Sequence, residues 1–105
     1  MSAITPLPIE AEPWLTRNLG FAGHEHKQWV YRFGNGYGAS VVQGQHTYGG
    51  PAGLYELAVI SFDGDEWHLT YQTPITEDVL GHLTLAEVAE TLVRIAALPA
   101  PGATS

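Results

Sequence analysis

Two tight-turn signals limit this chain's possible folds more than any other feature. Asn35-Gly36 and Asp63-Gly64 each lie between runs of β-forming residues. Both dipeptides favour two-residue hairpin turns of type I′, in which both central residues need a positive φ. The hairpins predicted from them pair residues 28–33 with 37–43 and residues 54–62 with 65–72. We therefore expect an antiparallel sheet of four strands.

Turn geometry also predicts which residues share a face of each hairpin. With Asn35 and Gly36 as the turn, Tyr31 faces Ser40 and Trp29 faces Val42. The same rule in the second hairpin predicts one apolar face made of Ala58, Ile60, Phe62, Trp67, Leu69 and Tyr71.

A single helix is expected after the second hairpin. Thr84 and Glu87 have the spacing of a capping box, in which each side chain bonds the other's backbone amide. One apolar stripe follows at helical spacing, made of Leu85, Val88, Ala89, Leu92, Ile95 and Ala96. Pro99 ends the helix. The prediction is an α+β domain of order β-β-β-β-α, with the C-terminal helix packed on one face of the sheet.

The domain boundaries follow from proline and glycine. Pro6, Pro8 and Pro13 favour an extended Pro-rich arm over residues 1–13, the single domain spans residues 14–99, and residues 100–105 form a flexible tail. One helix covers only one sheet face, although both faces carry apolar side chains. Either the arm and the loop 43–53 cover the second face, or another protein does, because large uncovered apolar patches mark interaction sites.

The charge balance excludes some partners and favours others. The chain has 11 acidic and 4 basic residues, a net charge of −7, and residues 33–93 contain no Lys or Arg. A shortage of cations argues against direct nucleic-acid binding and against an anionic membrane surface. Acidic residues favour encounter with a protein whose surface is basic.

Location follows from what the sequence lacks. It contains no cysteine, which excludes disulfides and thiolate zinc sites. The first residues do not resemble a secretory signal, and no apolar run approaches the ~20 residues of a membrane span. We expect a cytoplasmic protein.

The sequence carries no catalytic signature. Ser40 and Ser61 lie in predicted strands without the context of a nucleophile elbow. His24 and His26 would point the same way on a strand, but the histidine spacings match no zinc pattern. We expect a non-enzymatic protein without a cofactor, and a small His-dependent metal-binding protein is the less favoured alternative.

Aromatic and acidic side chains are the candidate contacts to a partner. The aromatics at positions 29, 31 and 33 fit three roles, which are core packing, a protein interface and base stacking; the last requires basic neighbours that are scarce here. Desolvated Trp and Tyr side chains anchor interfaces, while acidic rims steer encounter. The predicted partner-binding residues are Trp29, Tyr31, Tyr37, Tyr48, Asp63, Asp65 and Glu66.

Several stretches resemble short accessory proteins encoded by phages and prophages. They are Trp29–Val42, Tyr48-Gly49-Gly50, Gly53–Val59, Thr73–Thr76 and Leu80–Thr84, and the resemblance extends over about residues 29–98. Such proteins are mostly of unassigned function and often act by binding a host protein, inhibitors of CRISPR effectors or of other defence complexes being one kind. The resemblance implies a phage-type inhibitor or modulator that occludes a host protein. A self-assembling structural protein, closing as a homodimer, is the alternative.

Overall fold

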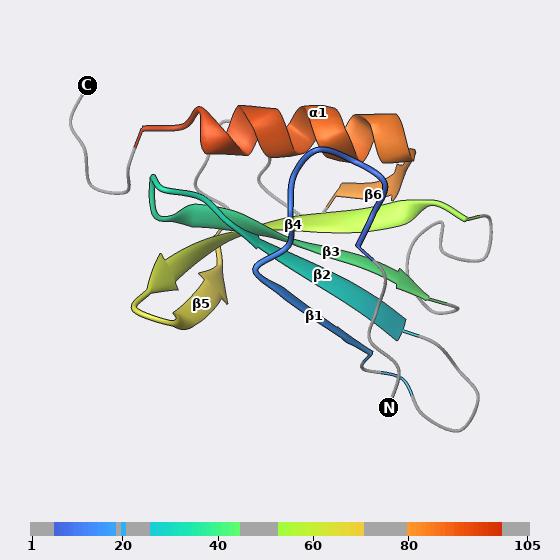
Figure 1. The fold of residues 1–105 in the computed structure, drawn as a ribbon, viewed down its shortest axis with the longest axis horizontal. Coiled ribbons are helices and arrows are strands. Elements are labelled where there is room, and N and C mark those ends of the chain that lie inside the picture. The colour runs from blue at the N-terminus through green and yellow to red at the C-terminus, as the bar shows by residue number, and fades with distance from the viewer. Residues whose placement is uncertain (1–5, 19, 21–25, 45–52, 71–79, 100–105) are drawn as a thin grey trace.

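The computed structural model describes residues 6–18, 20, 26–44, 53–70 and 80–99. It shows an α+β fold, in which one C-terminal helix lies across one face of an antiparallel sheet (Figure 1). The elements are β1 (Leu15–Asn18), β2 (His26–Arg32), β3 (Tyr37–Gly44), β4 (Tyr55–Asp63), β5 (Glu66–Leu69), β6 (Leu80–Leu83) and α1 (Leu85–Ala96). The strand order is β1-β2-β3-β4-β5, and β6 also pairs with β4. Since β3 occupies one edge of β4, β5 and β6 share the other.

The prediction of four strands is two short of the described sheet. The missing strands, β1 and β6, are each four residues long. β1 pairs with β2 from Leu15 opposite Val30 to Asn18 opposite Lys27. β6 pairs with the start of β4, where Tyr55 lies opposite Leu83. Strands this short show too few alternations to stand out in a sequence.

The predicted register of the first hairpin is wrong by one residue. The connection has three residues, because the Phe33 amide donates to the Tyr37 carbonyl at 2.9 Å, and only Gly36 among them has positive φ, at 88°. Asn35 therefore does not adopt the conformation that a type I′ turn requires. Tyr31 pairs with Ala39 and Trp29 with Val41. A one-residue shift exchanges the faces, so Ala39 and Val41 lie on the same face as the two aromatics.

The second hairpin is shifted by two residues, which preserves the predicted face. Its turn is Gly64-Asp65, with Asp63 paired to Glu66 and a positive φ of 63° at Gly64 alone. Phe62 pairs with Trp67 and Ile60 with Leu69. Their shared face is confirmed, because an even shift leaves the alternation intact. Tyr71 lies outside the described residues.

The predicted capping box of α1 is confirmed. The Glu87 amide donates to Thr84 Oγ1 at 3.2 Å, and the Thr84 amide donates to Glu87 Oε1 at 3.0 Å. The hydrogen bond from the Thr84 amide to the carboxylate, with a smaller contribution from the Thr84 side chain, favours the ionised form and lowers the pKa of Glu87. The buried positions of the helix are Val88, Thr91, Leu92 and Ile95. The buried Thr91 hydroxyl is satisfied within the helix, since it donates to the Glu87 carbonyl at 2.7 Å.

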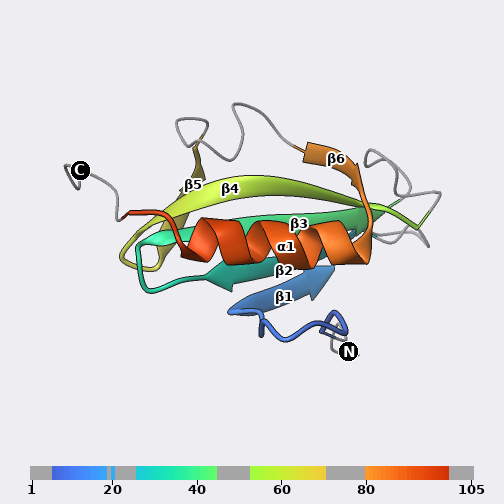
Figure 2. The same cartoon turned by 90° about the horizontal axis from the view of Figure 1, so that it is seen from above.

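The core lies between α1 and the sheet face beneath it. Figure 2 shows the helix running along β3, with β2 and β4 on either side. The fully buried side chains of this core include Tyr31, Val41 and Leu57 from the sheet and Val88 and Ile95 from the helix.

The Pro-rich arm also packs on the helix-covered face. Leu7 belongs to the core and is 6% exposed, while Ile9 and Ala11 pack against it. The described part of the arm loops beside α1 before entering β1 (Figure 1). Of the two alternatives for covering the second face, the one that places the arm there does not hold for residues 6–13. The loop 43–53 falls mostly outside the described residues, so its part of that expectation stays a prediction.

The end of α1 is held by a side chain from the first hairpin turn. The Asn35 amide donates to the carbonyls of Ile95 and Leu98, both at 2.9 Å. Its own carbonyl accepts from the Tyr37 amide at 3.0 Å. Helix ends leave four carbonyls without partners inside the helix. Asn35 satisfies two acceptors there and fixes the helix end above the turn.

Candidate interaction face

The side of the sheet turned away from α1 is called the open face here. The sheet curls on this side, and β5 lies opposite the helix (Figure 1). Val30 and Ile60 point to this face and are both 0% exposed although no helix covers them. Because the sheet curls, side chains from its outer strands cover the middle of the central strands on this face. The open face carries Trp14, Arg17, Gln28, Arg32, Ser40, Phe62, Trp67 and Leu69.

Arg32 forms the first cluster of the open face. Its guanidinium carbon lies 4.5 Å from the Phe62 ring centroid and 5.6 Å from that of Trp14. The two rings meet edge to face, 5.3 Å apart. One terminal nitrogen of Arg32 bonds Asp65 Oδ1 at 3.0 Å, and the other donates to the Gly64 carbonyl at 2.6 Å. Both terminal nitrogens of Arg32 are thus engaged within the protein.

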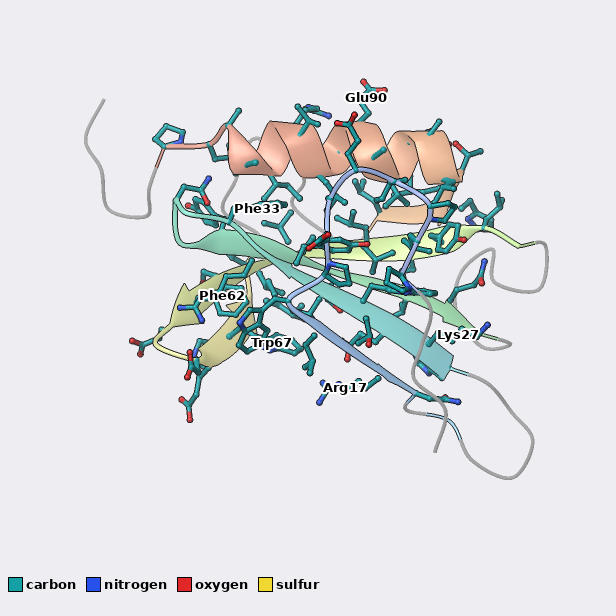
Figure 3. The ribbon with its side chains drawn as sticks, in the orientation of Figure 1. Arg17, Lys27, Phe33, Phe62, Trp67 and Glu90 are labelled. Atoms are coloured by element: carbon teal, nitrogen blue, oxygen red, sulfur yellow. The ribbon has the colours of Figure 1, made fainter. Side chains whose placement is uncertain are left out.

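Arg17 forms the second cluster, across the face. Its Nε donates to Gln28 Oε1 at 2.5 Å, and Gln28 Nε2 donates to Ser40 Oγ at 2.8 Å. Gln28 and Ser40 are only 5% and 7% exposed. The Arg17 guanidinium lies 5.8 Å from the Trp67 ring centroid, so β1 and β5, the two ends of the strand order, meet across the face. Figure 3 shows Arg17, Phe62 and Trp67 on the side of the sheet away from α1.

Exposed apolar side chains complete the face. Trp14 is 44% exposed and Leu69 is 49% exposed, next to the half-buried Phe62 and Trp67. Aromatic and arginine side chains, which surround these two residues, are enriched at protein interfaces. The described residues hold one other large exposed apolar side chain, Val93 on α1, at 71%.

The three predicted acidic contacts lie together at one end of the open face. Asp63, Asp65 and Glu66 surround the β4–β5 turn, and all three are exposed. The Asp65 side chain is 91% exposed, so its ion pair with Arg32 contributes at most about 1 kcal/mol to stability. The turn therefore presents a small acidic rim.

Two of the four predicted aromatic contacts lie in the core. Trp29 and Tyr31 are 3% and 0% exposed in the core under α1, where a partner does not reach them in this fold. Of the three roles that the sequence left open for these aromatics, the structure assigns core packing to both Trp29 and Tyr31. Tyr37 is half-buried against the same core, and Tyr48 lies outside the described residues. The sequence alone did not show which sheet face the helix covers.

Tyr31 is also the polar exception within that core. Its hydroxyl is buried, and no hydrogen-bond partner lies within reach of it in the described residues. Burial, with a smaller contribution from Tyr55, raises the pKa of Tyr31 to about 12. Desolvation disfavours the charged phenolate, which explains the direction.

Sequence reasoning missed the residues that define the open face. The grouping of Phe62, Trp67 and Leu69 was predicted from the second hairpin, but their exposure was not. Arg17 lies in β1, a strand that was not predicted, and Trp14 is the residue directly before that strand. The available signal was that three of the four basic residues, Arg17, Lys27 and Arg32, lie within the first 32 residues.

The other sequence hypotheses find limited support in the described residues. These residues contain no group of three or more His, Cys, Asp or Glu side chains able to hold a metal ion. His24 lies outside them, so the metal hypothesis based on His24 and His26 stays a prediction. The described ranges also contain no helix long and apolar enough to cross a membrane.

A groove lies between the arm and α1, on the helix side of the sheet. It has a volume of about 560 Å³. The groove is lined by Ile9, Glu10, Ala11, Phe33, Ala89, Leu92, Val93 and Ala96. Its walls are almost entirely apolar, with Glu10 as the one charged residue. Nothing in the structure indicates what would cover it.

The sequence and the fold were compared with known proteins. No protein-family model, curated protein or solved structure matches this sequence.

Proposed function

We propose that the protein is a small non-enzymatic interaction module that binds another protein through the open face. The observation that supports this is the exposure of Trp14 and Leu69, 44% and 49%, on the side that the helix leaves uncovered. Arginine and aromatic side chains surround them, and these residue types dominate interface hot spots. The dry core lies on the opposite face, so binding at the open face requires no unfolding of the domain.

The partner we propose carries a basic patch that faces the acidic rim. Asp63 and Glu66 are exposed, and no ion pair of either with a described residue is found. The net charge of −7 adds a longer-range attraction to cations. Rim charges of this kind chiefly raise the association rate, while the buried apolar centre of an interface provides most of the affinity.

Occlusion of a host protein is the mode of action that fits this surface. A rigid sheet face with apolar anchors can cover a functional surface on its partner without chemistry of its own. The resemblance of residues 29–98 to phage and prophage proteins supports a host protein, such as a defence complex, as the target. The site of action would then be the host cytoplasm.

A matched pair of substitutions tests the face. Leu69 on the open face and Val93 on α1 are both exposed and aliphatic, so Leu69→Ser and Val93→Ser make similar chemical changes. Affinity-tagged wild type and both variants are used to capture partners from host lysate, and the captured protein is identified by mass spectrometry. We expect Leu69→Ser to weaken capture about tenfold, since truncating an interface anchor commonly costs more than 1 kcal/mol. Val93→Ser is expected to capture as wild type does.

Two results would overturn the proposal. Equal capture by Leu69→Ser and wild type would show that the open face is not the binding surface. A concentration-dependent dimer in light scattering, abolished by Leu69→Ser alone, would replace the host partner with a second copy of this protein.

A further inference from the structure

The two arginines of the open face differ in how their charge is balanced. Arg32 is paired with the Asp65 carboxylate at 3.0 Å, and its second terminal nitrogen bonds a carbonyl. Arg17 makes a single hydrogen bond with the described residues, from Nε to the neutral Gln28 amide. No carboxylate of the described residues pairs with Arg17. Among the residues that the structure describes, Arg17 is therefore the cation of this face without a carboxylate partner.

The Arg17 guanidinium is nevertheless held in place. Gln28 accepts its Nε–H and is itself fixed by the bond from Nε2 to Ser40, both residues being more than nine-tenths buried. Trp67 lies 5.8 Å from the guanidinium carbon, within the range of a cation–π contact. Because Nε is engaged, the pair of donors for a ligand is the two terminal nitrogens, which bond no residue that the structure describes. A guanidinium presents such a pair in the geometry that a carboxylate accepts with both oxygens.

We propose that Arg17 binds a carboxylate of the protein partner, either an Asp or Glu side group or the partner's terminal carboxylate, with Trp67 beside it. This inference rests on the proposed function and adds a specific contact to it. Gln28 and Trp67 already orient the Arg17 guanidinium. Arg17 therefore loses little side-chain freedom when the carboxylate binds. A partner would thus offer a basic patch to the acidic rim and a carboxylate to Arg17, and the two opposite charges would fix its orientation on the face.

A protein carboxylate suits this site better than the phosphates of a nucleic acid. Asp63, Asp65 and Glu66 at one end of the open face repel a run of phosphates, and one unpaired arginine does not neutralise several charges. Nucleic-acid affinity depends on many such neutralised phosphates. A lone carboxylate needs only one guanidinium.

The test uses benzoate as the probe and nuclear magnetic resonance as the readout. The Trp67 indole N–H and the Arg17 Nε–H signals of ¹⁵N-labelled full-length protein are followed while benzoate is added. Benzamide serves as the neutral control, and inorganic phosphate and a short single-stranded DNA are titrated separately. We expect saturable shifts at both signals with benzoate and none with benzamide, and weaker binding of phosphate and DNA.

Variants that change the net charge equally separate the site from a general charge effect. Arg17→Gln and Arg94→Gln each remove one positive charge, and Arg94 is exposed on α1. We expect about tenfold weaker benzoate binding in Arg17→Gln, the change expected for one charge-assisted contact, and unchanged binding in Arg94→Gln. Arg17→Lys keeps the charge without the planar pair of donors and should be intermediate. Dispersed spectra of each variant confirm that it is folded.

Some outcomes would overturn this inference while leaving the proposed function in place. The carboxylate site is wrong if benzoate causes no saturable shift, if Arg17→Gln binds it as wild type does, or if phosphate or DNA binds more tightly. The capture experiment depends on Leu69 rather than on Arg17. If Leu69→Ser loses capture while benzoate causes no shift, the open face remains the proposed binding surface and only the carboxylate site at Arg17 is rejected.

Discussion

The two faces of the sheet are buried in different ways. Tyr31 and Val30 are neighbours on β2, point to opposite faces, and are both 0% exposed. On the helix-covered face, apolar side chains exclude water. The buried Thr91 hydroxyl bonds within the helix, and the buried Tyr31 hydroxyl has no partner among the described residues. On the open face, a hydrogen-bonded network through Gln28 and Ser40 lies beneath arginines and exposed aromatics. Dry packing stabilises the fold, and the curled, polar face can be buried at its centre while remaining accessible at its borders.

The largest expected effect separates the faces by stability. Leu92 on α1 is 2% exposed in the core, whereas Leu69 on the open face is 49% exposed. Leu92→Ala should lower the free energy of unfolding by about 2–5 kcal/mol, because it removes buried methyl groups and leaves a cavity. Leu69→Ala should change it by less than about 0.5 kcal/mol. Urea denaturation measures both, and similar losses from the two variants would mean that the open face belongs to the core.

A smaller effect is expected from the polar network of the open face. Ser40→Ala leaves the buried Gln28 amide without its acceptor, which should cost about 1–3 kcal/mol of unfolding free energy. It should also loosen Arg17, since Gln28 positions the guanidinium. Ser61→Ala, at a partly exposed position on β4, is the control and should fall within about 0.5 kcal/mol of wild type. Equal stability of the Ser40 variant and this control, again measured in urea, would show that the network is not a stabilising unit.

The smallest expected change in stability comes from the buried Tyr31 hydroxyl of the helix-covered face. Unlike the two preceding variants, its removal is not expected to destabilise the fold. Tyr31→Phe removes a buried polar group that has no described partner, so we expect stability to stay equal or to rise by up to about 1 kcal/mol. A clear loss of stability would instead reveal a partner for the hydroxyl.

The same variant predicts a pH dependence. The unfolded protein ionises Tyr31 near the usual pKa of 10.0, while the folded protein keeps the proton until about 12. The folded state binds more protons between these values, so the contribution of Tyr31 is complete below pH 10 and is lost as pH rises toward 12. Denaturation curves of wild type and Tyr31→Phe over this range should therefore diverge, with the wild type losing more stability. Parallel curves would contradict the assigned shift.

Local signals in the sequence predicted the elements, and long-range contacts escaped them. The capping box at Thr84 and the turn regions were correct because each depends on residues within a few positions. The Asn-Gly pair did not fix the register, since its loop has three residues and only Gly36 takes positive φ. That one-residue difference exchanged the faces around Tyr31. A two-residue difference at Gly64 left the face of Phe62 intact.

The candidate site was less predictable than the fold for a related reason. Arg17 and Trp67 are 50 positions apart and meet only because the sheet curls. Neither residue type nor spacing encodes that curl. The acidic rim could be predicted because its members are consecutive or nearly so around one turn. Trp29 and Tyr31 lie in the core, which the sequence did not show, because the choice of face depends on where α1 packs.

The bond from Asn35 to the end of α1 links the folding of two distant segments. The amide reaches the Ile95 carbonyl across 60 positions of sequence, a separation that slows closure and raises contact order. We therefore expect the last helical turn to gain protection against hydrogen exchange together with the first hairpin. We expect fraying of the helix terminus to break the Asn35 bonds and so to be coupled to opening of the hairpin turn.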